Sequence, residues 1–115
     1  MADRLPALRA ALWALRAAGT ARRQLRRDGL NRIELPEPPR VPENASRGVL
    51  AALRRRPATC LERALVLQRW YAAHGRPHDI VIGVAGTAES FEAHAWLEGE
   101  DPGRGYRELS RVPAP

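Results

Sequence analysis

Residues 59–70 read TCLERALVLQRW and predict a helix with a defined first turn. Thr59 and Glu62 have the spacing of a capping box, in which a hydroxyl and a carboxylate each accept a hydrogen bond from a free backbone N–H group. Apolar residues recur at helical spacing after them, so one face of this helix should be buried. Cys60, the only cysteine of the chain, falls in the first turn. The helix dipole there favours the nucleophilic thiolate, whereas most lone cysteines are small buried apolar residues.

Length and composition indicate a single domain. A chain of 115 residues buries about two-thirds of its unfolded surface, which suffices for a core without disulfides. One cysteine cannot form an internal disulfide, so nothing indicates an oxidising compartment. No apolar run reaches the roughly 20 residues that span a bilayer, and the arginine-rich N-terminus lacks the apolar core of a signal peptide. We therefore expect a cytoplasmic protein.

The charge of the chain is strongly positive, at +6, and all 19 basic residues are arginine. Such a balance is found in proteins that bind nucleic acid or another anionic partner. The chain, however, has no zinc-finger spacing and no aromatic-rich strand on which bases would stack. We therefore expect no nucleic-acid binding.

Residues 1–44 predict an amphipathic helix followed by a proline-rich linker. The helix covers residues 5–27, with Gly19 and Thr20 marking a bend or a break. Four prolines between residues 35 and 42 predict an extended connection after it. We expect the apolar stripe of the helix to pack on the domain itself, the alternative being a membrane surface. The stripe consists of Leu5, Leu8, Leu12, Leu15 and Leu25.

Residues 45–115 predict the core of the protein. A second helix starts near residues 43–46 and ends at residues 54–56, ahead of the helix that carries Cys60. Helices followed by an antiparallel meander give an α+β fold, with the N-terminal helices packed on the sheet. The strands are predicted at residues 80–84, 91–98 and 106–112.

Cys60 and His94, 34 residues apart, are the candidate catalytic pair. Thiol catalysis needs a thiolate, an imidazole that holds and then donates a proton, and a polar group that orients the imidazole. A cysteine at a helix start followed by a histidine on a strand is the chain order of papain-like and transglutaminase-like enzymes. The alternation of the strand puts Trp96 on the face of His94, where it would shield the imidazole from water or line a substrate cleft.

Three blocks of the sequence resemble the B2-type proteins of lasso-peptide biosynthesis, small bacterial leader peptidases with a transglutaminase-like core. The blocks are TCLERAL at residues 59–65, IVIGV at 80–84 and FEAHAWLE at 91–98. The resemblance implies that Cys60 is the nucleophile and His94 the general acid and base. It implies a cysteine endopeptidase that cuts the leader–core junction of a ribosomally made lasso precursor peptide, and no cofactor is expected.

The resemblance also implies partners. Proteins of this kind work with a separate leader-recognition protein, of the B1 or RRE type. They hand the core peptide to an ATP-dependent lasso cyclase that closes the macrolactam. In some members the recognition domain is fused in front, but we expect residues 1–44 to be too short and too helical for such a domain.

The third catalytic residue is the point at which the chain departs from the family pattern. Family members place an aspartate about a dozen residues after the histidine, where this chain has Tyr106. A five-residue hairpin loop at residues 99–103 would set Glu108 directly opposite His94, with the Cβ atoms about 5 Å apart on one face. This geometry favours Glu108 as the group that orients the imidazole.

Other interpretations stay open. Aligning the acidic residues of the predicted hairpin with the family nominates Asp101, or Glu100, and a shortened hairpin would fit a weakened activity. A thiol acyl-transferase would pass the acyl group to an amine, and a non-catalytic scaffold would keep the fold and only dock partners. His74 and His78 have a helical metal-ligand spacing, but helix-breaking residues lie between them, so we predict no metal site.

Overall fold

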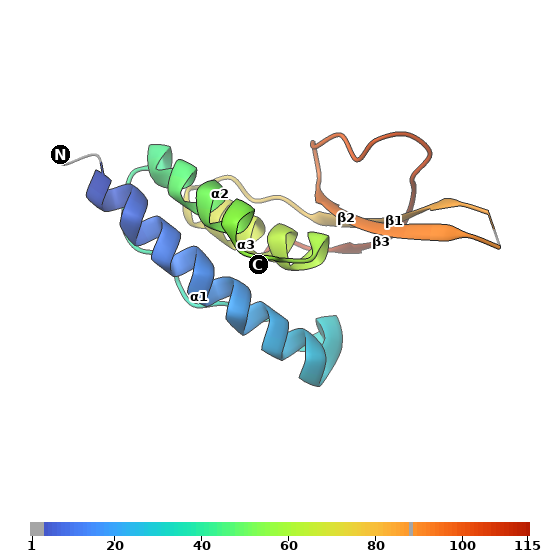
Figure 1. The fold of residues 1–115 in the computed structure, drawn as a ribbon, viewed down its shortest axis with the longest axis horizontal. Helices are drawn as coiled ribbons and strands as arrows, with labels where there is room; N and C mark the ends of the chain where they lie inside the picture. Colours follow the sequence, from blue (N-terminus) through green and yellow to red (C-terminus); the bar gives the residue numbers. More distant parts are fainter. Residues whose placement is uncertain (1–3, 88) are drawn as a thin grey trace.

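Three α-helices precede a three-stranded sheet in the computed structural model, which describes residues 4–87 and 89–115 (Figure 1). The predicted α+β class is confirmed, and the predicted helices and strands are present with bounds that differ by a few residues. Residues 1–3 of the predicted N-terminal segment and residue 88, between the first two predicted strands, lie outside the described residues. Along the described chain the α-helices are α1 (Arg4–Asp28), α2 (Ser46–Arg55) and α3 (Cys60–Ala73), the 3-10 helices are η1 (Gly29–Arg32) and η2 (Glu43–Ala45), and the strands are β1 (Ile80–Gly86), β2 (Phe91–Leu97) and β3 (Arg107–Val112).

One hydrophobic core joins the helices to the sheet. Trp70 of α3 is fully buried, and the centroid of its ring lies 5.7 Å from that of Trp13 in α1. Ile80 and Leu97 bring β1 and β2 into the same cluster. Burial of each large apolar side chain contributes about 1.5–3 kcal/mol to folding. The core therefore fixes α3, and with it Cys60, relative to the sheet.

α1 is a single helix that runs through Gly19 and Thr20, and its buried face is not the predicted one. Trp13 and a set of alanines face the core, whereas the leucines of the N-terminal half are exposed; only Leu25 packs against the core. The expectation that the leucine stripe packs on the domain was therefore wrong. The buried alanines are Ala10, Ala14, Ala17, Ala18 and Ala21.

A close approach of α1 and α2 explains why the alanines of α1, and not its leucines, face the core. A Cβ atom placed on Gly48 of α2 would lie only 2.0 Å from the backbone oxygen of Ala7 in α1. Backbones come this close only where residues are small, so leucines cannot be accommodated on this face. No membrane-spanning helix occurs among the described residues, since none is both long and apolar enough.

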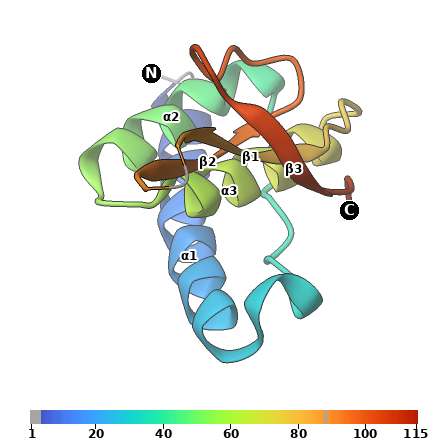
Figure 2. The ribbon, with the colours of Figure 1, turned by 90° about the vertical axis from the view of Figure 1, so that its right-hand side faces the viewer.

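The sheet is antiparallel with strand order β2-β1-β3, so β1 lies at its centre (Figure 2). The predicted direct pairing of residues 91–98 with 106–112 is wrong, because each of these strands pairs with β1 instead. The chain between them turns at Gly99, Gly103 and Gly105, whose φ angles of 98°, 95° and 84° suit glycine. These turns let residues 98–106 form a loop that leaves the sheet (Figure 1) rather than the tight hairpin we expected.

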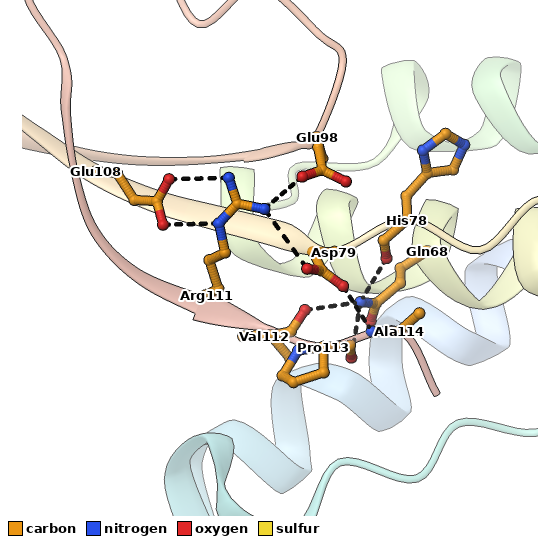
Figure 3. Close-up of polar contacts among 9 residues, drawn as sticks. All are labelled: Gln68, His78, Asp79, Glu98, Glu108, Arg111, Val112, Pro113 and Ala114. Atoms are coloured by element: carbon orange, nitrogen blue, oxygen red, sulfur yellow. Dashed lines mark hydrogen bonds and ion pairs between the residues drawn. The ribbon is translucent and has the colours of Figure 1, made fainter.

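A buried glutamine ties the end of the chain to α3. Gln68 is 5% exposed, and its amide nitrogen lies 3.0–3.1 Å from the carbonyl oxygens of His78, Val112 and Pro113 (Figure 3). Asp79 accepts a further hydrogen bond from the backbone N–H group of Ala114, at 3.1 Å. These contacts hold β3 and the residues after it in place.

Candidate active site

Cys60 is the first residue of α3, and the predicted capping box is confirmed. The backbone N–H group of Glu62 donates to the Thr59 hydroxyl oxygen at 3.1 Å, and the N–H group of Thr59 donates to the Glu62 carboxylate at 3.2 Å. Cys60 is a free thiol that is partly exposed. The backbone N–H groups of Cys60 and Leu61 have no hydrogen-bond partner within the described chain, as is usual at a helix start. The helix therefore offers free donors next to the sulfur.

His94 lies in the middle of β2, and two aromatic rings hold its imidazole. Ala95 and Leu97 of the same strand belong to the core, so His94 and Trp96 alternate with them and face away from it. The centroid of the His94 ring lies 5.7 Å from that of Trp96 and 5.4 Å from that of Tyr106. Trp96 and Tyr106 are 5.9 Å apart. We call these three residues the aromatic cluster.

Gly83 of β1 makes room for this cluster. It pairs with His94, and a Cβ atom at this position would lie 2.6 Å from the Trp96 ring and 2.8 Å from the backbone oxygen of Arg107. Any larger residue would therefore displace the ring or the backbone of β3. A glycine inside a strand often marks such a close approach, so Gly83 was the signal in the sequence that a bulky side chain packs over β1.

Tyr106 connects the aromatic cluster to the carboxylate of Glu92. Its hydroxyl donates a hydrogen bond to the Glu92 carboxylate at 3.1 Å. This hydrogen bond raises the pKa of Tyr106 above its ordinary value, and partial burial and the negative charge of Glu92 add to the effect. The charge of a Cys60 thiolate acts in the same direction and is the smallest of these effects. Tyr106 therefore contacts His94, whereas Cys60 packs against the hydrophobic core.

The start of α3 is also tied to the loop that follows β2. Arg63, in the first turn of the helix, pairs with Glu100 at 3.8 Å, and Glu100 accepts a hydrogen bond from the backbone of Leu97 at 3.0 Å. Asp101 accepts a hydrogen bond from the N–H group of Gly103 at 2.9 Å. Glu100 and Asp101, the two alternatives to Glu108, therefore already have other partners. Glu100 is held by Leu97 and by Arg63 of α3, and Asp101 is held within the loop.

Glu108 lies on the far side of β1 from His94. Both residues pair with Gly83, so their backbones are two strand spacings apart, about 10 Å. Figure 3 shows the Glu108 carboxylate facing the guanidinium of Arg111, with nitrogen–oxygen distances of 2.7 and 2.9 Å. These hydrogen bonds lower the pKa of Glu108. The expected position of Glu108 directly opposite His94 was therefore wrong, because β1 lies between the two strands.

Hydrogen bonds to the predicted pair are few. Among the described residues no carboxylate hydrogen-bonds the His94 ring, and no hydrogen bond joins it to Cys60. In enzymes without bound substrate, catalytic hydrogen bonds are often long and shorten only when substrate is bound. The described part of the chain also has no group of three or more histidine, cysteine, aspartate or glutamate residues that could hold a metal ion.

Comparison with known families gives the class of the protein. A family model described as transglutaminase-like superfamily matches residues 4–111, from α1 to β3. The chain therefore belongs to the transglutaminase-like superfamily, which includes cysteine peptidases and acyl-transferases. No curated protein and no solved structure matches the chain.

Proposed function

We propose that this protein is a cysteine endopeptidase that removes the leader from a ribosomally made lasso precursor peptide. The observation that carries the proposal is the position of Cys60, which is a free, partly exposed thiol in the first turn of a capped helix. The resemblance of the sequence to lasso B2 proteins supplies the substrate class. It also supplies a B1- or RRE-type leader-recognition protein and a lasso cyclase as partners, in the cytoplasm of a bacterium.

In the proposed reaction His94 accepts the thiol proton and keeps Cys60 as a thiolate. The sulfur attacks the scissile carbonyl carbon and forms a carbon–sulfur bond, while the free N–H groups of Cys60 and Leu61 stabilise the oxyanion. His94 then protonates the leaving amine as the carbon–nitrogen bond breaks. Water attacks the resulting thioester, which releases the leader as a carboxylic acid and restores the thiol.

Orientation of the imidazole is assigned, within this proposal, to Tyr106. Its ring packs on His94, and its hydroxyl is held by Glu92, so the pair would position the imidazole by packing rather than by charge. The alternative is Glu108, as predicted from the sequence. Its involvement would require a rearrangement that frees its carboxylate from Arg111.

Mass spectrometry of the precursor peptide, incubated with this protein and a leader-recognition protein, tests the function. We expect a single cut that Cys60→Ala and His94→Ala each slow by about a thousandfold or more. His78→Ala is the matched control, since His78 lies in the irregular segment before β1, and it should cut at the wild-type rate. A cut that survives Cys60→Ala would contradict the peptidase.

Two other functions give different results in this experiment. A thiol acyl-transferase, the second activity known in the superfamily, would yield a conjugate when a primary amine is supplied. A scaffold that only docks partners is supported by the absence of a carboxylate bonded to His94 within the described residues. It predicts that wild type and Cys60→Ala both leave the peptide intact.

A further inference from the structure

The N-terminal half of α1 exposes a row of four leucines. Leu5, Leu8, Leu12 and Leu15 are 61%, 55%, 59% and 37% exposed, although an apolar row usually faces the core. They are spaced three, four and three residues apart. This spacing is that of the a and d positions of a coiled coil, whose narrow seam pairs with one other helix. We call these four residues the leucine seam.

Arginines border the leucine seam. In the heptad that the leucines define, Arg9 and Arg16 occupy e positions and Arg4 a g position. None of these three guanidinium groups has an ion-pair partner within the described residues. The helix has no acidic residue in that half. Charges at e and g select the partner of a coiled coil, so this seam selects negative charge.

The surface beside the leucine seam is hollowed on both sides. One hollow of about 340 Å³ is lined by Leu12, Arg9 and Glu37 among others, and a second of about 220 Å³ by Leu15 and Arg56 among others. Hollows next to an apolar seam are able to receive side chains of a partner that packs on it. A flat lipid surface has no such side chains.

We propose that the leucine seam docks an acidic amphipathic helix of a partner protein. That helix carries apolar residues at its a and d positions over two heptads, and aspartate or glutamate at e and g. The seam ends at Gly19 and Arg22, which fall at the next a and d positions, so the contact is confined to the N-terminal half. The inference does not depend on the proposed peptidase activity.

The positive charge of α1 argues against a second copy of the chain or a membrane as the occupant of the leucine seam. In a pair of identical copies, the e and g arginines of one seam would face those of the other, without an acidic residue to neutralise them. On a membrane, α1 would lie with its whole outer face in the interface. The outer face of its C-terminal half, however, carries Arg22 and Arg26 in place of leucines.

The test measures binding of fluorescent synthetic peptides to the full chain carrying Cys60→Ala, which leaves no thiol chemistry. One peptide is a four-heptad helix with leucine at a and d and glutamate at e and g; the other has lysine at e and g. We expect the acidic peptide to bind and the basic peptide not to bind. Leu8→Ser and Leu12→Ser should each weaken binding by about tenfold or more.

Two controls make the result specific. Leu109→Ser removes a leucine that is 70% exposed on β3 and should leave binding unchanged. The double variant Arg9→Glu/Arg16→Glu should reverse the preference, so that the basic peptide binds better. Because all of these side chains are exposed, the variants should keep the wild-type circular dichroism spectrum and melting temperature.

Several outcomes would overturn the proposal. Failure of the acidic peptide to bind, or binding that Leu8→Ser leaves unchanged, would exclude an acidic helix as the occupant. A dimer in analytical ultracentrifugation that Leu12→Ser dissociates would assign the seam to a second copy. Binding to vesicles of phosphatidylglycerol, lost in Leu8→Ser while the acidic peptide stays unbound, would assign it to a membrane.

Discussion

The imidazole of His94 packs against the rings of Trp96 and Tyr106, and these two neighbours determine how its role can be tested. Trp96 is held over Gly83, and Tyr106 is held by its hydrogen bond to Glu92. Packing against these two rings restricts the rotation of the His94 ring even without a bonded carboxylate. A change in either neighbouring ring should therefore alter catalysis through the orientation of His94.

Tyr106→Ala should lower kcat for peptide cleavage by roughly ten- to a hundredfold, because a small displacement of a catalytic group has an effect of this size. KM should change little, since the loss concerns the transition state and not the binding of substrate. Tyr106→Phe keeps the ring and should retain most of the activity. The control is Phe91→Ala, which changes an exposed aromatic residue on β2, the strand that carries His94. A normal kcat in folded Tyr106→Ala would show that the ring does not position His94.

Glu108 is expected to stabilise the fold through Arg111. Its folded-state pKa lies below the ordinary 4.5, so the unfolded chain takes up the proton first as the pH falls. The contribution of the pair is therefore present above about pH 4.5 and is lost as the pH falls through the lowered value. Urea unfolding of wild type and Glu108→Gln should differ at pH 7, and the difference should shrink towards pH 3.

The control for Glu108 is Glu37→Gln, an exposed glutamate without an ion pair in the described part of the chain, which should show no such trend. The same variants separate stability from catalysis. If Tyr106 orients His94, Glu108→Gln should cut the precursor at close to the wild-type rate at pH 7. A loss like that of His94→Ala would instead restore Glu108 as the orienting group.

Among the elements, α3 organises the molecule because it contacts both the other helices and the sheet. Its buried Gln68 holds the end of β3, so Gln68→Ala should leave three carbonyl oxygens without their partner. We expect the free energy of unfolding to fall by about 1–3 kcal/mol, as measured by urea denaturation. Gln24→Ala removes a partly exposed glutamine that bonds the backbone of Glu34, and it should cost less than about 1 kcal/mol. Equal losses in the two variants would contradict this role of Gln68.

Elements that follow from local signals could be predicted from the sequence. Thr59 and Glu62 mark the start of α3, and the prolines after residue 35 mark the extended linker, because both act within a few residues. The buried face of α1 could not be predicted in this way. A periodic row of leucines indicates an apolar face, but the close approach of Gly48 to Ala7 decides which face is covered. That approach depends on residues about 40 positions apart.

The order of the strands is likewise a non-local property. Hydrophobic alternation predicts that residues 91–98 and 106–112 are strands but does not tell which strands pair. The glycines at 99, 103 and 105 gave the chain enough freedom to leave the sheet, so the loop did not close as a hairpin. The choice of Glu108 rested on that hairpin. The contact of Tyr106 with His94 could not be predicted either, because it depends on the same loop.

At the scale of the whole molecule, the leucine seam and the sheet lie towards opposite ends of the long axis (Figure 1). The described chain measures 52 × 30 × 26 Å along its principal axes. The family match includes α1, so this helix belongs to the same unit as the candidate site. A partner held on α1 would therefore leave the aromatic cluster accessible to a peptide.

The central claim is that Cys60, at the start of α3, and His94, on β2, act as one thiolate–imidazole pair. The rate of alkylation by iodoacetamide at pH 6 tests it directly, because the chain has a single cysteine and no substrate is needed. An isolated thiol is almost fully protonated at this pH and reacts slowly. We predict that His94→Ala slows alkylation of the folded protein by about tenfold or more, whereas His78→Ala does not. Equal rates in wild type and His94→Ala would contradict the pair.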